Sequence, residues 1–162
     1  MKKLKNVFLV NENLWMNSRN HKAIVDSCLV ENVECFTDYQ DVLDLLIYRG
    51  EFSNGAEPQI DDVCVVLDLD VNADYNFQFL EDFHNLPKHR RQGIYITVAS
   101  SLELGDVLKD QIMSYSEVIG ILESPINPRK LYNKVYKYKK RSLVHMLPGM
   151  FRTMNNPFGQ AS

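Results

Sequence analysis

Two aspartates, Asp68 and Asp70, stand at the end of an apolar run that reads VCVVLDLDVN over residues 63–72. An uninterrupted β-branched run of this length is typical of a strand that is buried on both faces in a parallel sheet. Its polar end then lies at the carboxyl edge of the sheet, where open α/β folds bind ligands. A carboxylate there can attack phosphorus to form an aspartyl phosphate. It can equally be a loop residue that caps the next turn, so the residues alone leave both readings open.

A second polar cluster, Asn11 with Glu12, follows an apolar run at residues 6–10. In a parallel sheet the first and third strands can be neighbours, and these side chains would then approach Asp68. Acidic groups that are brought together repel one another unless a cation or a proton compensates. The pattern therefore predicts a site for Mg²⁺, which takes one or two carboxylates, a carbonyl and water as ligands.

The elements that must position these residues alternate along the chain. Short apolar runs predict strands at residues 6–10, 33–36, from 63, 94–98 and 118–122. Helical patterns follow each of them, at residues 14–28, 38–50, 77–83 and 104–113 and from Pro128 onward. Five strand and helix units in this order predict a doubly wound parallel sheet with right-handed crossovers. Residues 51–62 and the basic segment 87–93 are predicted to be surface loops.

Length and composition bound the class of protein. A chain of 162 residues suits one well-cored domain, expected over residues 1–141. Residues 142–162 are expected to be a C-terminal extension that docks on the domain, binds a partner or is partly disordered. The net charge of -3 gives no electrostatic case for nucleic acid. No apolar stretch is long enough to span a membrane. The three cysteines are set among apolar residues, which predicts buried thiols in a reducing, cytoplasmic environment.

Four pieces of the chain, in order, are similar to one known family: VFLVNEN, VCVVLDLDVNADYNFQFLEDF, ITVASSLELGD and GILESPINPRKL. From about residue 4 to residue 140 the chain resembles the receiver domain of bacterial two-component response regulators. The resemblance implies a flavodoxin-like (βα)5 fold with strand order 2-1-3-4-5. It implies Asp68 as the phosphoacceptor. It also implies Mg²⁺ held by Glu12, Asp68 and the backbone carbonyl of Asp70, and weakly by Asn11.

Four positions depart from the family pattern. Asn11 replaces one of two acidic residues, which lowers the expected affinity for Mg²⁺. Ala99 stands at the position of a hydroxyl that binds the phosphoryl group, with Ser100 as the neighbouring hydroxyl. Ile121 stands at the position of an aromatic switch residue, and Ser124 replaces a lysine, so its cation is lost. We therefore expect an acceptor site without the usual switch.

These departures define the expected function. The chain is predicted to be a stand-alone signalling protein in a phosphorelay and not an enzyme, acting mainly through protein contacts. The upstream partner would be a histidine kinase or a phosphotransfer protein, and the downstream partner another protein. The family commonly uses the face around its last two strands and last helix, which corresponds here to residues 104–141.

Two alternatives remain open on the sequence. DLD after an apolar strand is similar to the first motif of haloacid dehalogenase-type phosphatases, with Asp68 as nucleophile and Asp70 as general acid and base. Val71 and Asn72 do not match that motif, and too little chain follows for its later motifs. The other alternative is an adaptor of receiver fold that is never phosphorylated.

Overall fold

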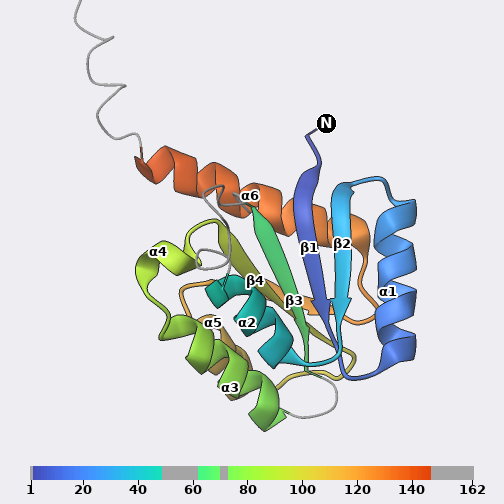
Figure 1. Cartoon of the computed structure of the whole chain (residues 1–162), viewed down its shortest axis with the longest axis horizontal. Helices are drawn as coiled ribbons and strands as arrows, with labels where there is room; N and C mark the ends of the chain where they lie inside the picture. The colour runs from blue at the N-terminus through green and yellow to red at the C-terminus, as the bar shows by residue number, and fades with distance from the viewer. Residues whose placement is uncertain (1, 49–61, 70–72, 147–162) are drawn as a thin grey trace, which may run out of the picture.

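The computed structural model describes residues 2–48, 62–69 and 73–146. They form a parallel sheet of five strands in the order β2-β1-β3-β4-β5, flanked by helices on both faces (Figure 1). The strands are β1 (Leu4–Val10), β2 (Val30–Phe36), β3 (Val63–Asp68), β4 (Ile94–Ser100) and β5 (Val118–Glu123). The helices are α1 (Leu14–Asp26), α2 (Tyr39–Tyr48), α3 (Ala73–His84), α4 (Lys88–Arg91), α5 (Asp106–Met113) and α6 (Pro128–Met146). The predicted fold class and strand order are confirmed.

Two hydrophobic layers sandwich the sheet. Helices α1 and α6 cover one face, where Ile24 and Leu131 pack on Val7, Leu9 and Val66. Helices α2, α3 and α5 cover the other face (Figure 1). There the rings of Phe79 and Phe83 of α3 are stacked. All six residues of β3 are buried, as expected for a strand in the middle of a sheet with two covered faces.

The basic segment 87–93 was predicted to be a loop, and this prediction was wrong in part. Residues 88–91 form the short helix α4. Arg91 makes an ion pair with the largely buried Glu117, which also contacts His84 at 3.1 Å. Glu117 thus connects the turn before β5 to both α3 and α4, because a buried carboxylate needs charged or hydrogen-bonding partners.

Helix α1 forms where the sequence predicts it, but the face that it buries is partly polar. Two of its apolar residues, Leu14 and Val25, are exposed. The face that packs on the sheet carries Asn17, Asn20 and Ile24. Their spacing of three and four residues places them on one side of the helix, so two polar side chains lie in the interior.

The prediction that all three cysteines are buried was also wrong. Cys64 lies inside β3 and is buried, whereas Cys28 and Cys35 are exposed. Cys28 follows the end of α1 and adopts a positive φ of 57°, a conformation of turns. Cys28 is thus exposed although apolar residues lie near it in the sequence, because it lies at a turn.

The last helix, predicted from Pro128 onward, packs on the sheet through apolar and aromatic side chains. Leu131 and Val135 are buried, and the ring of Tyr138 lies 5.2 Å from that of Tyr95 on β4. The domain boundary predicted at residue 141 falls inside α6 and stays a prediction, and residues 147–162 lie outside the described residues. None of the helices in the described part of the chain is long and apolar enough to cross a membrane.

Candidate functional site

Asp68 is the last residue of β3 and lies at the carboxyl edge of the sheet. It pairs in register with Ala99 of β4, and the next amide, that of Leu69, donates to the Ala99 carbonyl at 2.8 Å. Only 8% of Asp68 is exposed. The backbone ladder thus holds the carboxylate at the place the sequence predicts.

Asn11 follows β1 directly and reaches this carboxylate. Its Nδ2 donates a hydrogen bond of 2.8 Å to Oδ2 of Asp68, and its Oδ1 accepts one of 2.8 Å from the backbone N–H of Asn13. A backbone N–H can only donate, so the atom that faces it must be the amide oxygen. The amide nitrogen therefore points at Asp68.

Ser124 reaches the same carboxylate oxygen from beyond the end of β5. Its Oγ donates to Oδ2 of Asp68 at 3.3 Å, and its backbone N–H donates to the Ser100 carbonyl at 2.8 Å. The Ser124–Pro125 peptide bond is cis. The ends of β1, β3 and β5 thus meet at Asp68, and two neutral donors contact one of its oxygens.

The other two departing positions lie in strands β4 and β5. Ala99 is fully buried in the layer under α1 and α6. The hydroxyl of its neighbour Ser100 donates to the Leu102 carbonyl and accepts from the Leu102 N–H, both at 3.1 Å. Ile121 is partly buried against the layer under α2, α3 and α5. Ser100 therefore uses its hydroxyl to shape the loop after β4.

The described side chains do not fit a ready Mg²⁺ site. Glu12 is exposed, and Asp70 lies outside the described residues. Among the residues that the structure describes, there is no cluster of three or more histidine, cysteine, aspartate or glutamate side chains placed to hold a metal ion. Mg²⁺ requires oxygen ligands, whereas Asn11 presents an N–H group to Asp68. The amide would have to turn before its oxygen could serve as a ligand.

Sequence reasoning missed the two asparagines of α1 that position this cluster. Nδ2 of Asn17 donates to the backbone carbonyls of Asn11 at 2.9 Å and Phe36 at 2.8 Å, which joins the ends of β1 and β2. Its Oδ1 is buried and has no hydrogen-bond partner in the described part of the chain. A buried polar atom is normally paired, so Asn17 is held in place mainly by its two donor contacts.

Asn20 performs a similar task for the segment after β5. Its Oδ1 accepts a hydrogen bond of 3.1 Å from the N–H of Ile126, two residues after Ser124. Asn20 is almost fully buried. The signal available in the sequence was the spacing of Asn17 and Asn20 with Ile24, which puts polar residues on the face of a helix that carries an apolar one.

Comparison with known proteins gives a result at the level of structure only. No protein-family model matches the sequence, and no curated protein matches it. The chain is similar to the solved structure of a response regulator receiver protein from Dyadobacter fermentans, with a TM-score of 0.69 and 21% identity over 83% of this chain and 98% of the other.

Two further solved structures agree with this one. A two component response regulator from Cytophaga hutchinsonii has a TM-score of 0.69 and 14% identity over 86% of this chain and 99% of its own. A response regulator from Colwellia psychrerythraea has a TM-score of 0.58 and 16% identity over 86% and 99%. At such identities structural similarity establishes the fold, and function must be argued from the site. The chain has the fold of a response regulator receiver domain.

Proposed function

We propose that this chain is a receiver-type signalling protein that acts mainly through protein contacts and carries Asp68 at the phosphoacceptor position of a degenerate switch site. The observation that supports the proposal is the pair of neutral hydrogen bonds from Asn11 and Ser124 to Asp68. The receiver fold of the described residues supports it as well.

The neutral donors weaken phosphorylation in this proposal. Transfer of a phosphoryl group to Asp68 brings additional negative charge to a buried carboxylate, and charge of this kind is stabilised by cations. Asn11 and Ser124 supply an amide and a hydroxyl at positions where the family pattern has an acidic metal ligand and a lysine. Phosphorylation of Asp68 is then weak, unconventional or absent.

The conformational response of the protein to a phosphate on Asp68 is weakened too. A ligand shifts a conformational equilibrium only if it interacts differently with the two states. The family uses a hydroxyl and an aromatic ring for this, and here those positions hold Ala99 and Ile121. A phosphate on Asp68 therefore has few contacts through which it can change the surface of the protein.

The proposed partners follow from this assignment. The upstream partner is a histidine kinase or a phosphotransfer protein, the downstream partner is a protein, and the chain itself is not an enzyme. The adaptor of receiver fold differs from this proposal only in that Asp68 is never modified. A phosphatase would also need Asp70, which lies outside the described residues, and no observed contact favours it.

The proposal is tested by incubating the protein with acetyl phosphate and Mg²⁺ and measuring its intact mass. We expect a small adduct of one phosphate that is lost at alkaline pH and is missing from Asp68→Asn. Complete and Mg²⁺-dependent labelling of the wild type would contradict a degenerate site. Absence of any adduct with every donor tried would favour the alternative in which the chain is an adaptor of receiver fold that is never phosphorylated.

A further inference from the structure

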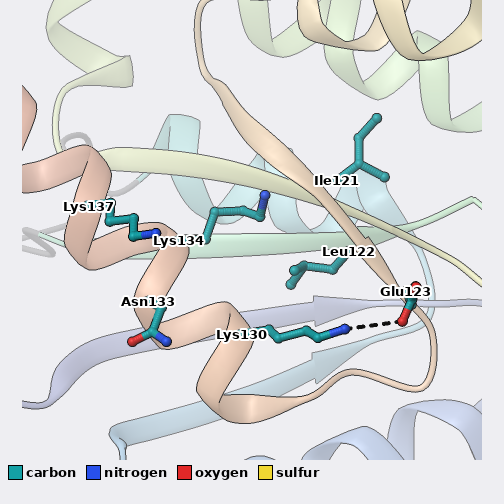
Figure 2. A pocket seen from close by; sticks show the side chains of 7 residues that line it. All are labelled: Ile121, Leu122, Glu123, Lys130, Asn133, Lys134 and Lys137. Atoms are coloured by element: carbon teal, nitrogen blue, oxygen red, sulfur yellow. Dashed lines mark hydrogen bonds and ion pairs between the residues drawn. The ribbon is translucent and has the colours of Figure 1, made fainter. Parts of the chain in front are cut away.

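A basic pocket of about 430 Å³ lies between β5 and α6, and Asp68 is not one of its lining residues (Figure 2). Its lining residues are Ile121, Leu122, Glu123, Lys130, Asn133, Lys134 and Lys137. The three lysines occupy positions i, i+4 and i+7 of α6, which places them on one side of the helix. We call the pocket with these three side chains the lysine groove.

Two of the three ammonium groups lack a compensating charge. Lys130 pairs with Glu123 at 3.2 Å, as the dashed line in Figure 2 marks. Lys134 and Lys137 make no ion pair within the described part of the chain. Burial, and secondly the neighbouring Lys137, lower the pKa of Lys134. The groove is therefore locally positive on a chain whose net charge is -3.

Gly120 of β5 allows this arrangement. The side chain of Lys134 lies across the strand so closely that a Cβ atom at position 120 would be 2.4 Å from its Nζ. Gly120 also has a φ of +154°, which L residues rarely adopt. Any side chain at this position would push the ammonium group of Lys134 away from the strand.

The groove runs along a sheet edge. β5 is the last strand in the order, and no described strand lies on its outer side. Such an edge offers backbone groups to an extended chain. From Lys130 to Lys137 the helix rises about 10 Å, and five residues of a strand cover about 13 Å, with every second side chain on the same side. Flexible lysine side chains can reach across the difference of about 3 Å between these two lengths.

We propose that the lysine groove binds an extended acidic segment of a protein partner, whose alternate aspartate or glutamate side chains contact Lys134 and Lys137. This inference rests on the proposed function, since it names the chemistry of a partner for a protein that acts through contacts. Charge complementarity favours an anionic partner, and the position of the groove at the last described strand of the sheet favours a peptide chain over nucleic acid.

The test uses a fluorescein-labelled peptide of eight residues in which glutamate and threonine alternate, with binding to the full chain measured by fluorescence anisotropy at low ionic strength. The double variant Lys134→Gln and Lys137→Gln should weaken binding by roughly fivefold or more, since it removes two charge contacts. The matched control Lys140→Gln removes the same kind of charge from α6 outside the groove. It should change binding by less than about twofold.

A gain-of-binding variant keeps the test valid if the double variant is unstable. Glu123→Gln removes the negative charge from the groove and frees Lys130, so we expect binding to tighten by about two- to threefold. Amide shift changes in NMR spectra should concentrate on residues 118–123 and on the groove side of α6. The Glu123 side chain is 86% exposed, so this variant should fold normally.

Three results would overturn the inference. They are an equal loss of binding in Lys140→Gln, no binding by the wild type, and tighter binding of an oligothymidylate with the same charge as the peptide. None of these results bears on the proposed function, because the phosphorylation assay reads Asp68 and the peptide assay reads the lysines.

Discussion

The carboxamide of Asn11 donates a 2.8 Å hydrogen bond to the carboxylate of Asp68 and thereby links the end of β1 to the end of β3. Both side chains are buried. Where the family pattern places a second acidic residue, this protein places a neutral donor. The carboxylate thus has a partner without a metal ion, because a hydrogen bond to the charged form stabilises it.

Asn11→Asp should convert this hydrogen bond into a repulsion between two carboxylates. We expect the free energy of unfolding to fall by about 1–3 kcal/mol at pH 8 relative to the wild type. The loss should be smaller at low pH, since a protonated carboxyl removes the repulsion, and Mg²⁺ should recover part of it. Urea unfolding at several pH values, with and without Mg²⁺, measures all three effects.

The control for this variant is Asn13→Asp. Asn13 is the N-cap of α1, and its side chain accepts hydrogen bonds from the N–H groups of Trp15 and Met16. Aspartate caps helices as well as asparagine does and interacts favourably with the helix dipole. The same added charge should therefore leave stability unchanged or raise it. An equal loss in both variants would show that the effect is not local to Asp68.

Ser124→Lys combined with Ala99→Thr should restore the missing cation and hydroxyl around Asp68. We expect a larger phosphate adduct from acetyl phosphate than in the wild type, because an ammonium group compensates the phosphoryl charge. Intact mass before and after alkaline treatment measures the adduct. The triple variant that also carries Asp68→Asn serves as the control. An unchanged adduct would indicate that the backbone around the site no longer has the geometry needed for phosphorylation.

Asn17→Ala should loosen α1 from the sheet. The variant loses two hydrogen bonds to the carbonyls of Asn11 and Phe36. We expect the free energy of unfolding to fall by about 1–3 kcal/mol, the cost of leaving buried polar groups unpaired. Ser18→Ala, at the next and exposed position of the same helix, should change it by less than about 0.5 kcal/mol. Similar values for the two variants in urea unfolding would refute the positioning role of Asn17.

Ionisation of the Cys64 thiol in the unfolded chain should make the protein less stable in alkaline solution. Burial raises the pKa of this thiol to about 12, from an ordinary value of 9.0. The thiol ionises more readily in the unfolded chain, so its contribution to stability is complete below pH 9 and is lost as the pH rises toward 12. The stability difference between wild type and Cys64→Ala should therefore narrow above pH 9, by up to about 1.4 kcal/mol per pH unit. A constant difference would mean that the native thiol ionises normally.

The sequence predicted the elements because their signals are local. A β-branched run such as that of β3 reads as a buried strand whatever surrounds it, and Pro128 marks the start of α6 through its fixed φ and its missing N–H. The placement of Asp68 follows from the same reasoning, since a polar residue after such a strand lies at the carboxyl edge of the sheet. The strand order was supplied by the resemblance, because several orders satisfy the same alternation.

The contacts of the site were decided by tertiary structure. Sequence reasoning treated Asn11 and Ser124 as losses of charge, whereas in the fold both donate to one oxygen of Asp68. Which face of α1 is buried was also decided there, since Asn17 finds backbone acceptors only once the ends of β1 and β2 lie side by side.

By itself, then, the sequence determined the order of strands and helices along the chain and the strand end that carries Asp68. The tertiary structure alone decided which atom of Asn11 faces that carboxylate, that Ser124 reaches it, and that Lys134 lies across Gly120. The physical reason is the separation along the chain over which each kind of interaction acts. Periodicity and turn chemistry act between neighbours in the chain, whereas a hydrogen bond between residues 57 positions apart exists only after the sheet has formed.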